Sequence, residues 1–69
     1  MAHWHGKVDE TDDFGGKIDK VFIDGAVKGM GSWAIMNEAS FKKFGRGLGT
    51  GHGQKYEKQA DGKWLKVEG

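Results

Sequence analysis

Glycine occupies every second position from Gly45 to Gly53, and this run lies among cations. Because glycine has no Cβ, the backbone amides of such a run can approach a phosphate closely. Cations and aromatic rings beside exposed amides are the combination that binds single-stranded nucleic acid. The side chains that we expect to form this nucleic-acid site are Lys42, Lys43, Arg46, His52, Lys55 and Trp64. In the alternative interpretation, the glycines only let the chain pass close to a helix or an aromatic ring.

The glycine run matches neither of the common nucleotide-phosphate motifs. A Walker A loop needs a glycine followed by Lys-Ser or Lys-Thr, and this sequence has none. A dinucleotide fingerprint, G-x-G-x-x-G, needs a last glycine at a position held here by Thr50, His52, Gln54 or Tyr56. Both motifs also precede a helix, whereas this run follows the expected one. The sequence therefore argues against nucleotide hydrolysis.

Metal binding and catalysis find little support among the other polar residues. The chain has no cysteine, which excludes disulfides and thiolate zinc sites. His3 and His5 alternate around Trp4, but a metal site needs three or four ligands, so we expect surface histidines there. The remaining candidates for nucleophilic or acid–base chemistry are Ser32, Ser40, Asp12 and Asp13. Because none has the sequence context of a catalytic group, we expect Asp12 and Asp13 to be solvated, and we expect no enzyme, no metal and no cofactor.

The charges are distributed unevenly along the chain. Residues 1–41 contain four lysines and seven acids, whereas residues 42–69 contain seven cations and three acids, and the net charge is +1. A basic half indicates a surface that faces a polyanion, although a solvated surface with segregated signs is the alternative. No apolar run approaches the ~20 residues that span a bilayer, and the first residues lack the apolar region of a signal peptide. We expect a cytoplasmic protein that binds no membrane and no small-molecule substrate.

The sequence predicts a helix of about two turns just before the glycine run. Asn37 is a favoured N-cap, and Gly45 suits the C′ position that ends a helix. Met36 and Phe41 occupy the two positions of a hydrophobic staple. The charged residues that match the helix dipole are Glu38 in the first turn and Lys42 and Lys43 in the last. A helix this short needs packing against strands, because propensity alone does not hold it.

The C-terminal residues predict a β-hairpin around Asp61-Gly62, a pair typical of a two-residue type I′ turn. In the register that we prefer, the cross-strand pairs run from Ala60 with Lys63 to Lys55 with Glu68. The residues that then share one face are Tyr56, Leu65 and Val67, and Trp64 points to the other face. A different turn, with Gly62 in a bulge, stays open.

These elements predict a small α+β domain. The runs 21–23 and 33–36 favour a first hairpin with a long glycine-containing loop, followed by the helix, the glycine run and the second hairpin. Residues 1–13 are polar and show no periodicity, so we expect a mobile or loosely docked segment before a single domain of residues 14–69. The expected core consists of Val21, Ile23, Trp33, Ile35, Phe41, Phe44, Tyr56, Leu65 and Val67.

Three strings, FIDG (22–25), GSWAIM (31–36) and FGRGLGTGHGQKY (44–56), resemble a family of small, mostly uncharacterised phage and bacterial proteins. In that family, two CxxC pairs hold zinc in a treble-clef finger. The matching positions here are Thr11, Phe14, Asn37 and Ser40, none of which replaces a thiolate. The resemblance covers roughly residues 11–69. It implies a metal-free, treble-clef-like domain held by apolar packing, with Phe14 filling the vacated site.

We therefore expect a non-enzymatic, phage-like binding module whose basic, glycine-rich face contacts nucleic acid. The alternative is a protein-binding module, such as a phage-encoded inhibitor of a host or defence factor. Aromatic side chains dominate the energetics of protein interfaces. The anchors in that alternative would be Trp33, Trp64 and Met30.

Overall fold

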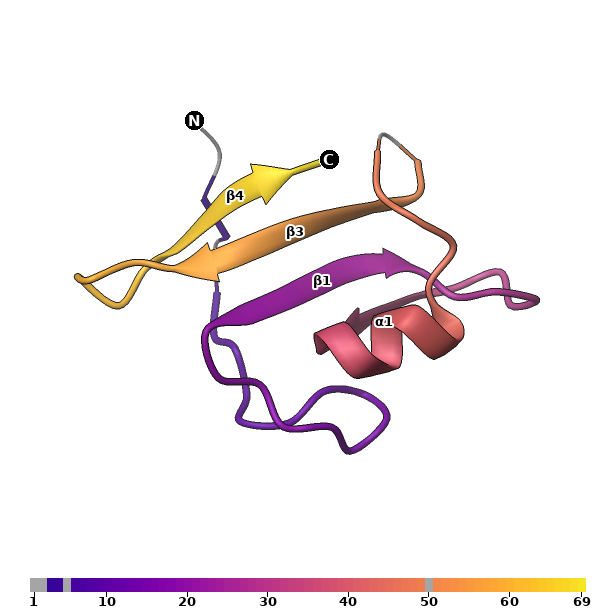
Figure 1. Ribbon diagram of the computed structural model, residues 1–69, viewed down its shortest axis with the longest axis horizontal. Coiled ribbons are helices and arrows are strands. Elements are labelled where there is room, and N and C mark those ends of the chain that lie inside the picture. The colour runs from indigo at the N-terminus through magenta and orange to yellow at the C-terminus, as the bar shows by residue number, and fades with distance from the viewer. Residues whose placement is uncertain (1–2, 5, 50) are drawn as a thin grey trace.

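Four antiparallel strands form one sheet, and a single short helix lies on one of its faces (Figure 1). The computed structural model describes residues 3–4, 6–49 and 51–69. The elements are β1 (Val21–Ala26), β2 (Trp33–Met36), α1 (Glu38–Phe44), β3 (Gly53–Lys58) and β4 (Trp64–Glu68). The strand order is β2-β1-β3-β4. The expected α+β class is confirmed, and no helix among the described residues is long and apolar enough to cross a membrane.

Helix α1 begins and ends where the sequence predicts. The Asn37 side chain accepts a hydrogen bond from the Ser40 N–H at 2.7 Å, as an N-cap does. The residues that match the helix dipole are those predicted, Glu38, Lys42 and Lys43. Gly45 follows the helix but has φ −77° and ψ 149°, which is not the left-handed conformation of a C′ glycine. The residue is glycine for a different reason, because a Cβ there would collide with the Phe41 ring.

The turn between β3 and β4 differs from the two-residue turn that we preferred. The Gln59 N–H donates to the Lys63 carbonyl at 2.7 Å, which leaves a loop of three residues between them. The Gly62 N–H in turn donates to the Gln59 carbonyl at 2.9 Å, and Gly62 has φ 84°. This is the bulged turn with glycine in the left-handed region, the alternative that the sequence left open.

The register of β3 and β4 shifts with the turn. Lys55 pairs with Glu68 as predicted, but a bulge between Lys55 and Tyr56 moves the remaining pairs by one residue, so that Tyr56 pairs with Lys66. Because side chains alternate along a strand, Trp64 lies on the same face as Lys66 and Tyr56. The prediction that Trp64 points away from the Tyr56 face is therefore wrong.

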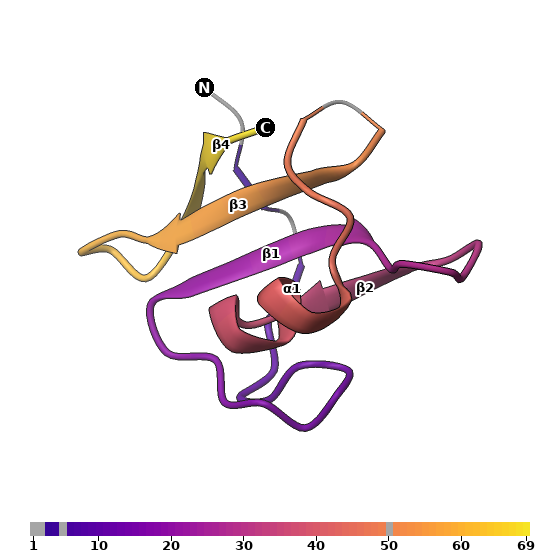
Figure 2. The ribbon, with the colours of Figure 1, turned by 45° about the vertical axis from the view of Figure 1, so that its right-hand side comes forward.

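Both faces of the sheet are covered near its centre. Phe22 and Ile23 are neighbours on β1 and point to opposite faces, yet they are only 0% and 1% exposed. Figure 2 shows α1 in front of the sheet and the N-terminal segment passing behind it. The helix covers the face of Ile23, and the N-terminal segment covers the face of Phe22.

Aromatic rings form the core behind the sheet. Phe22 stacks on Tyr56 with ring centroids 5.1 Å apart, and Trp64 meets Phe22 edge-on at 4.9 Å. The Trp4 ring packs edge-on against both Phe22, at 5.2 Å, and Tyr56, at 5.4 Å. The backbone N–H of Trp4 donates to the Trp64 carbonyl at 3.0 Å. Ile18 is buried in the same cluster. The segment that we expected to dock loosely thus contributes to the core of the domain, and its mobility stays a prediction.

The expected core was correct only in part. Ile23 and Tyr56 are buried, and four more of the expected residues are half-buried, namely Val21, Ile35, Phe41 and Leu65. The three that are exposed, contrary to the prediction, are Trp33, Phe44 and Val67. Phe22 and Met36 were missed although both are 0% exposed. The prediction assumed one covered face, whereas a sheet covered on both faces buries successive residues of a strand.

Candidate functional site

A buried carboxylate joins the turn of residues 11–17 to the start of α1. Asp12 is 6% exposed. Its Oδ1 accepts hydrogen bonds from the N–H groups of Phe14 at 2.9 Å and Gly16 at 2.6 Å, and its Oδ2 accepts from the Asn37 N–H at 2.8 Å. The turn is closed by a hydrogen bond from the Asp12 N–H to the Gly16 carbonyl at 2.7 Å. Asp12 was expected to be solvated, and the structure corrects that expectation.

The hydrogen bonds determine the charge state of this carboxylate. Burial raises the pKa of Asp12, but the three backbone N–H donors and the Ser40 side chain together outweigh it, and the pKa lies below its ordinary value of 3.8. A carboxylate that accepts several backbone hydrogen bonds is stabilised in its charged form. Asp12 is therefore an ionised structural group at neutral pH.

Two exposed phenylalanines stack on each other beside this turn. The rings of Phe14 and Phe44 have centroids 4.4 Å apart and an angle of 22° between their planes. They are 41% and 38% exposed, so Phe14 does not fill an interior site as the resemblance implied. Both rings line a groove of about 420 Å³ between the turn and α1, and Lys43 lines it too.

Exposed cations gather where α1 ends, next to this aromatic pair. The Lys28 N–H donates to the Phe44 carbonyl at 2.7 Å, which places Lys28 beside the last turn of the helix and its exposed Lys43. The Arg46 N–H donates to the Ala26 carbonyl at 3.1 Å. We call Lys28, Lys43 and Arg46 the helix-end cations. Among the described residues, the single ion pair within 4.0 Å joins Lys55 and Glu38, so no described acid lies within ion-pair distance of the helix-end cations.

The remaining predicted site residues are divided between different surfaces. Lys42 and Lys55 line a separate groove of about 220 Å³ between α1 and β3, where Lys55 Nζ lies 4.0 Å from Glu38 Oε2. His52 is exposed, and its carbonyl accepts from the Ala26 N–H at 2.8 Å, so it lies near Arg46. Trp64 lies on the face of the sheet opposite to α1, where its ring meets Phe22. The structure thus places Lys43 and Arg46 at the end of α1 and His52 near Arg46. It adds Lys28, which the sequence did not indicate because Lys28 lies in the acidic half of the chain, before the glycine run.

Backbone conformation and close packing explain why glycine occupies so many positions of this run. Gly47, Gly49 and Gly51 have positive φ angles of 130°, 122° and 80°, a conformation that side chains rarely adopt. At Gly53 a Cβ would lie 2.7 Å from the Gly47 carbonyl oxygen. These positions support the architectural interpretation of the run, in which the chain crosses closely from α1 to β3.

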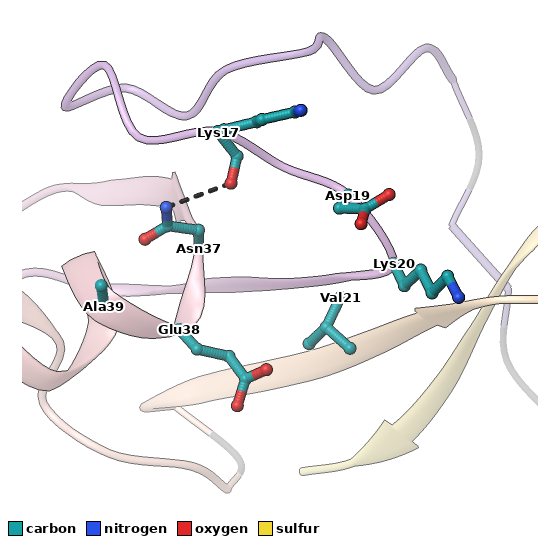
Figure 3. Close-up of a pocket in the computed structure, with 7 residues that line it drawn as sticks. All are labelled: Lys17, Asp19, Lys20, Val21, Asn37, Glu38 and Ala39. Atoms are coloured by element: carbon teal, nitrogen blue, oxygen red, sulfur yellow. Dashed lines mark hydrogen bonds between the residues drawn. The ribbon is translucent and has the colours of Figure 1, made fainter.

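A third groove, of about 340 Å³, lies between residues 17–21 and the start of α1 (Figure 3). Its charged lining residues are Lys17, Lys20, Asp19 and Glu38, two of each sign. Asn37 is already engaged there, because its Nδ2 donates to the Lys17 carbonyl at 3.1 Å. Figure 3 shows the Lys20 ammonium group pointing away from the Glu38 carboxylate, with Val21 between them. The groove therefore offers no convergent set of groups for a ligand.

Within residues 3–4, 6–49 and 51–69, no three His, Asp or Glu side chains are grouped as metal ligands. His3 is exposed, and His5 lies outside the described residues. Comparison with protein-family models, with curated proteins and with solved structures found no match for this chain. The helix-end cations and the aromatic pair beside them are therefore the features that indicate a ligand.

Proposed function

We propose that this chain is a non-enzymatic binding module whose helix-end cations contact the sugar-phosphate backbone of nucleic acid. One observation carries the proposal: Lys28, Lys43 and Arg46 are exposed, gathered at one end of the domain and free of ion pairs with described acids. Unpaired surface cations release counterions from nucleic acid when they bind phosphates, which drives sequence-independent binding. His52 lies near Arg46 and extends this surface. Lys42 lines the separate groove between α1 and β3 with Lys55, and the ion pair of Lys55 with Glu38 makes that lysine a weaker contact.

We further propose that the domain is a metal-free version of the treble-clef finger of the small phage and bacterial proteins that it resembles. A turn closed by a bridge between Thr11 and Lys17 precedes the β1–β2 hairpin, and α1 follows it. The Asp12 carboxylate joins the turn to the start of α1 at Asn37. In this proposal, hydrogen bonds to one carboxylate link the parts that a zinc ion links in the cysteine-containing proteins that the chain resembles.

The proposal is tested by fluorescence anisotropy with labelled oligonucleotides at several salt concentrations. The triple variant Lys28→Gln, Lys43→Gln and Arg46→Gln removes the helix-end cations. Each phosphate contact on a single strand contributes roughly 0.7 to the slope of log K against log salt, so three lost contacts should lower that slope by about 2.

A matched control separates the site from the net charge. The control variant Lys7→Gln, Lys20→Gln and Lys63→Gln removes the same charge at exposed positions away from the end of α1. We expect it to keep most of the salt slope of the wild-type chain. Equal effects of the two triple variants, or no binding by the wild type at low salt, would contradict the proposal, because electrostatic attraction is strongest at low salt.

A second candidate function, protein binding, is favoured by one observation. Met30 is 60% exposed and Trp33 is 45% exposed, both at one end of the β1–β2 hairpin. Large exposed apolar side chains are typical anchors of protein interfaces. A Trp33→Ala variant should lose a host protein captured from nuclease-treated lysate while keeping its oligonucleotide affinity. If the variant still captures that protein, the β1–β2 hairpin is not the surface that binds it.

A further inference from the structure

The structure assigns a second role to the domain: we propose that the Phe14–Phe44 pair receives an unpaired base, so that the module prefers single strands to duplex. The inference rests on the proposed function and specifies its substrate class. Phe14 and Phe44 touch each other with centroids 4.4 Å apart while both remain more than a third exposed. Two rings that lie outside the core yet keep a stacked geometry offer a flat aromatic surface to a ligand.

Backbone hydrogen bonds fix the main-chain positions from which both rings project. The Phe14 N–H donates to the buried Asp12 carboxylate at 2.9 Å. Phe44 is the last residue of α1, and its carbonyl accepts from the Lys28 N–H at 2.7 Å. A surface that is already ordered loses little conformational entropy on binding. The pair is thus pre-organised from two segments that are thirty residues apart in the chain.

The groove beside the rings suits a flat, polar-edged ring with a phosphate attached. It measures about 420 Å³, and Gly15 and Gly16 supply part of its lining without side chains. Lys43 lines the same groove, and Lys28 and Arg46 lie near its Phe44 end. This charge complements a polyanion, and stacking on aromatic side chains accepts any base because every base has a π face.

The same geometry disfavours duplex at this position. Bases within a duplex are already stacked on their neighbours and must be unstacked before they reach a protein ring. A strand with free bases can place one base on the Phe14–Phe44 surface while its phosphates meet the helix-end cations. The aromatic pair therefore adds affinity for single strands only.

The experiment compares three labelled probes by anisotropy: an oligothymidylate of roughly 12–16 nucleotides, its duplex with oligoadenylate, and a strand of equal length made of abasic sites. The variant is Phe14→Leu with Phe44→Leu. Loss of a stacked base typically weakens binding by roughly tenfold or more. We expect that loss with oligothymidylate, no change with the duplex or the abasic strand, and an unchanged salt slope.

Two further variants keep the result interpretable. Phe14→Tyr with Phe44→Tyr retains the rings and should retain wild-type affinity, which separates stacking from folding. Trp33→Leu removes an exposed aromatic ring outside the groove and should leave oligothymidylate affinity unchanged.

The outcomes also separate this inference from the proposed function. An equal loss on the abasic strand, or no loss on oligothymidylate, overturns the role of the aromatic pair while the binding of the backbone by cations stands. Failure of the wild-type chain to bind any of the three probes at low salt overturns both.

Discussion

Replacement of Asp12 by asparagine tests the link between the turn of residues 11–17 and α1. The carboxylate of Asp12 accepts from the N–H groups of Phe14, Gly16 and Asn37 and is 6% exposed. Asparagine keeps the shape and one acceptor oxygen, but its NH₂ group must face at least one of these donors. A hydrogen bond to a charged group contributes about 1.5–3 kcal/mol and a neutral one about 0.5–1.5 kcal/mol, and an unsatisfied buried donor costs about 1–3 kcal/mol. The expected destabilisation by Asp12→Asn is therefore roughly 2–4 kcal/mol.

A loss of this size is large for so short a chain, because stabilities of roughly 0.05–0.15 kcal/mol per residue give about 3–10 kcal/mol in total. It also depends on pH. The pKa of Asp12 is lower in the folded chain than its ordinary value of 3.8. The charged carboxylate therefore stabilises the fold fully above that pH, and the contribution is lost as the pH falls through the folded-state pKa. The difference between wild type and Asp12→Asn should shrink over that window.

The assay is urea-induced unfolding followed by tryptophan fluorescence, at neutral pH and at several values below about pH 4. Asp9→Asn is the control, because it makes the same charge change at an exposed residue of the same segment. We expect that variant to stay within about 0.5 kcal/mol of wild type. Neutral-pH stability of Asp12→Asn equal to wild type, or a deficit that does not change with pH, would refute the role given to this carboxylate.

Three further predictions concern the core, the end of α1 and metal. Phe22→Ala should lower the free energy of unfolding by about 3–5 kcal/mol because Phe22 is fully buried, and Phe41→Ala should lower it by less because Phe41 is half-buried. Equal losses of the two variants in urea unfolding would contradict a core on both faces of the sheet. Gly45→Ala should destabilise by about 1–3 kcal/mol through collision with Phe41, whereas Gly31→Ala meets open space and should be nearly neutral. A chelator should leave the thermal midpoint unchanged, and a large drop would reveal ligands that the cysteine-free sequence does not indicate.

The features that could be predicted from the sequence depend on residues close together in the chain. The N-cap Asn37 bonds to Ser40, three residues away, and the helix ends before Gly45 as its neighbours indicate. The two hairpins are also local, because each pairs two strands that are consecutive in the chain. The turn at Gly62 was harder, since a two-residue and a bulged three-residue turn use the same residues.

The candidate site, by contrast, was decided by the tertiary structure. The Asp12 carboxylate accepts from the Asn37 N–H across 25 residues, and this contact joins the turn that carries Phe14 to α1, where the Phe14 ring stacks on Phe44. Trp64 lies with Phe22 on the far face, because one bulged residue turns the whole strand over. Local periodicity determines which segments are strands or helices, but it does not indicate which segment covers each face of a sheet. Only the packing of the N-terminal segment and α1 on opposite faces decides which side chains are buried and which remain free to bind.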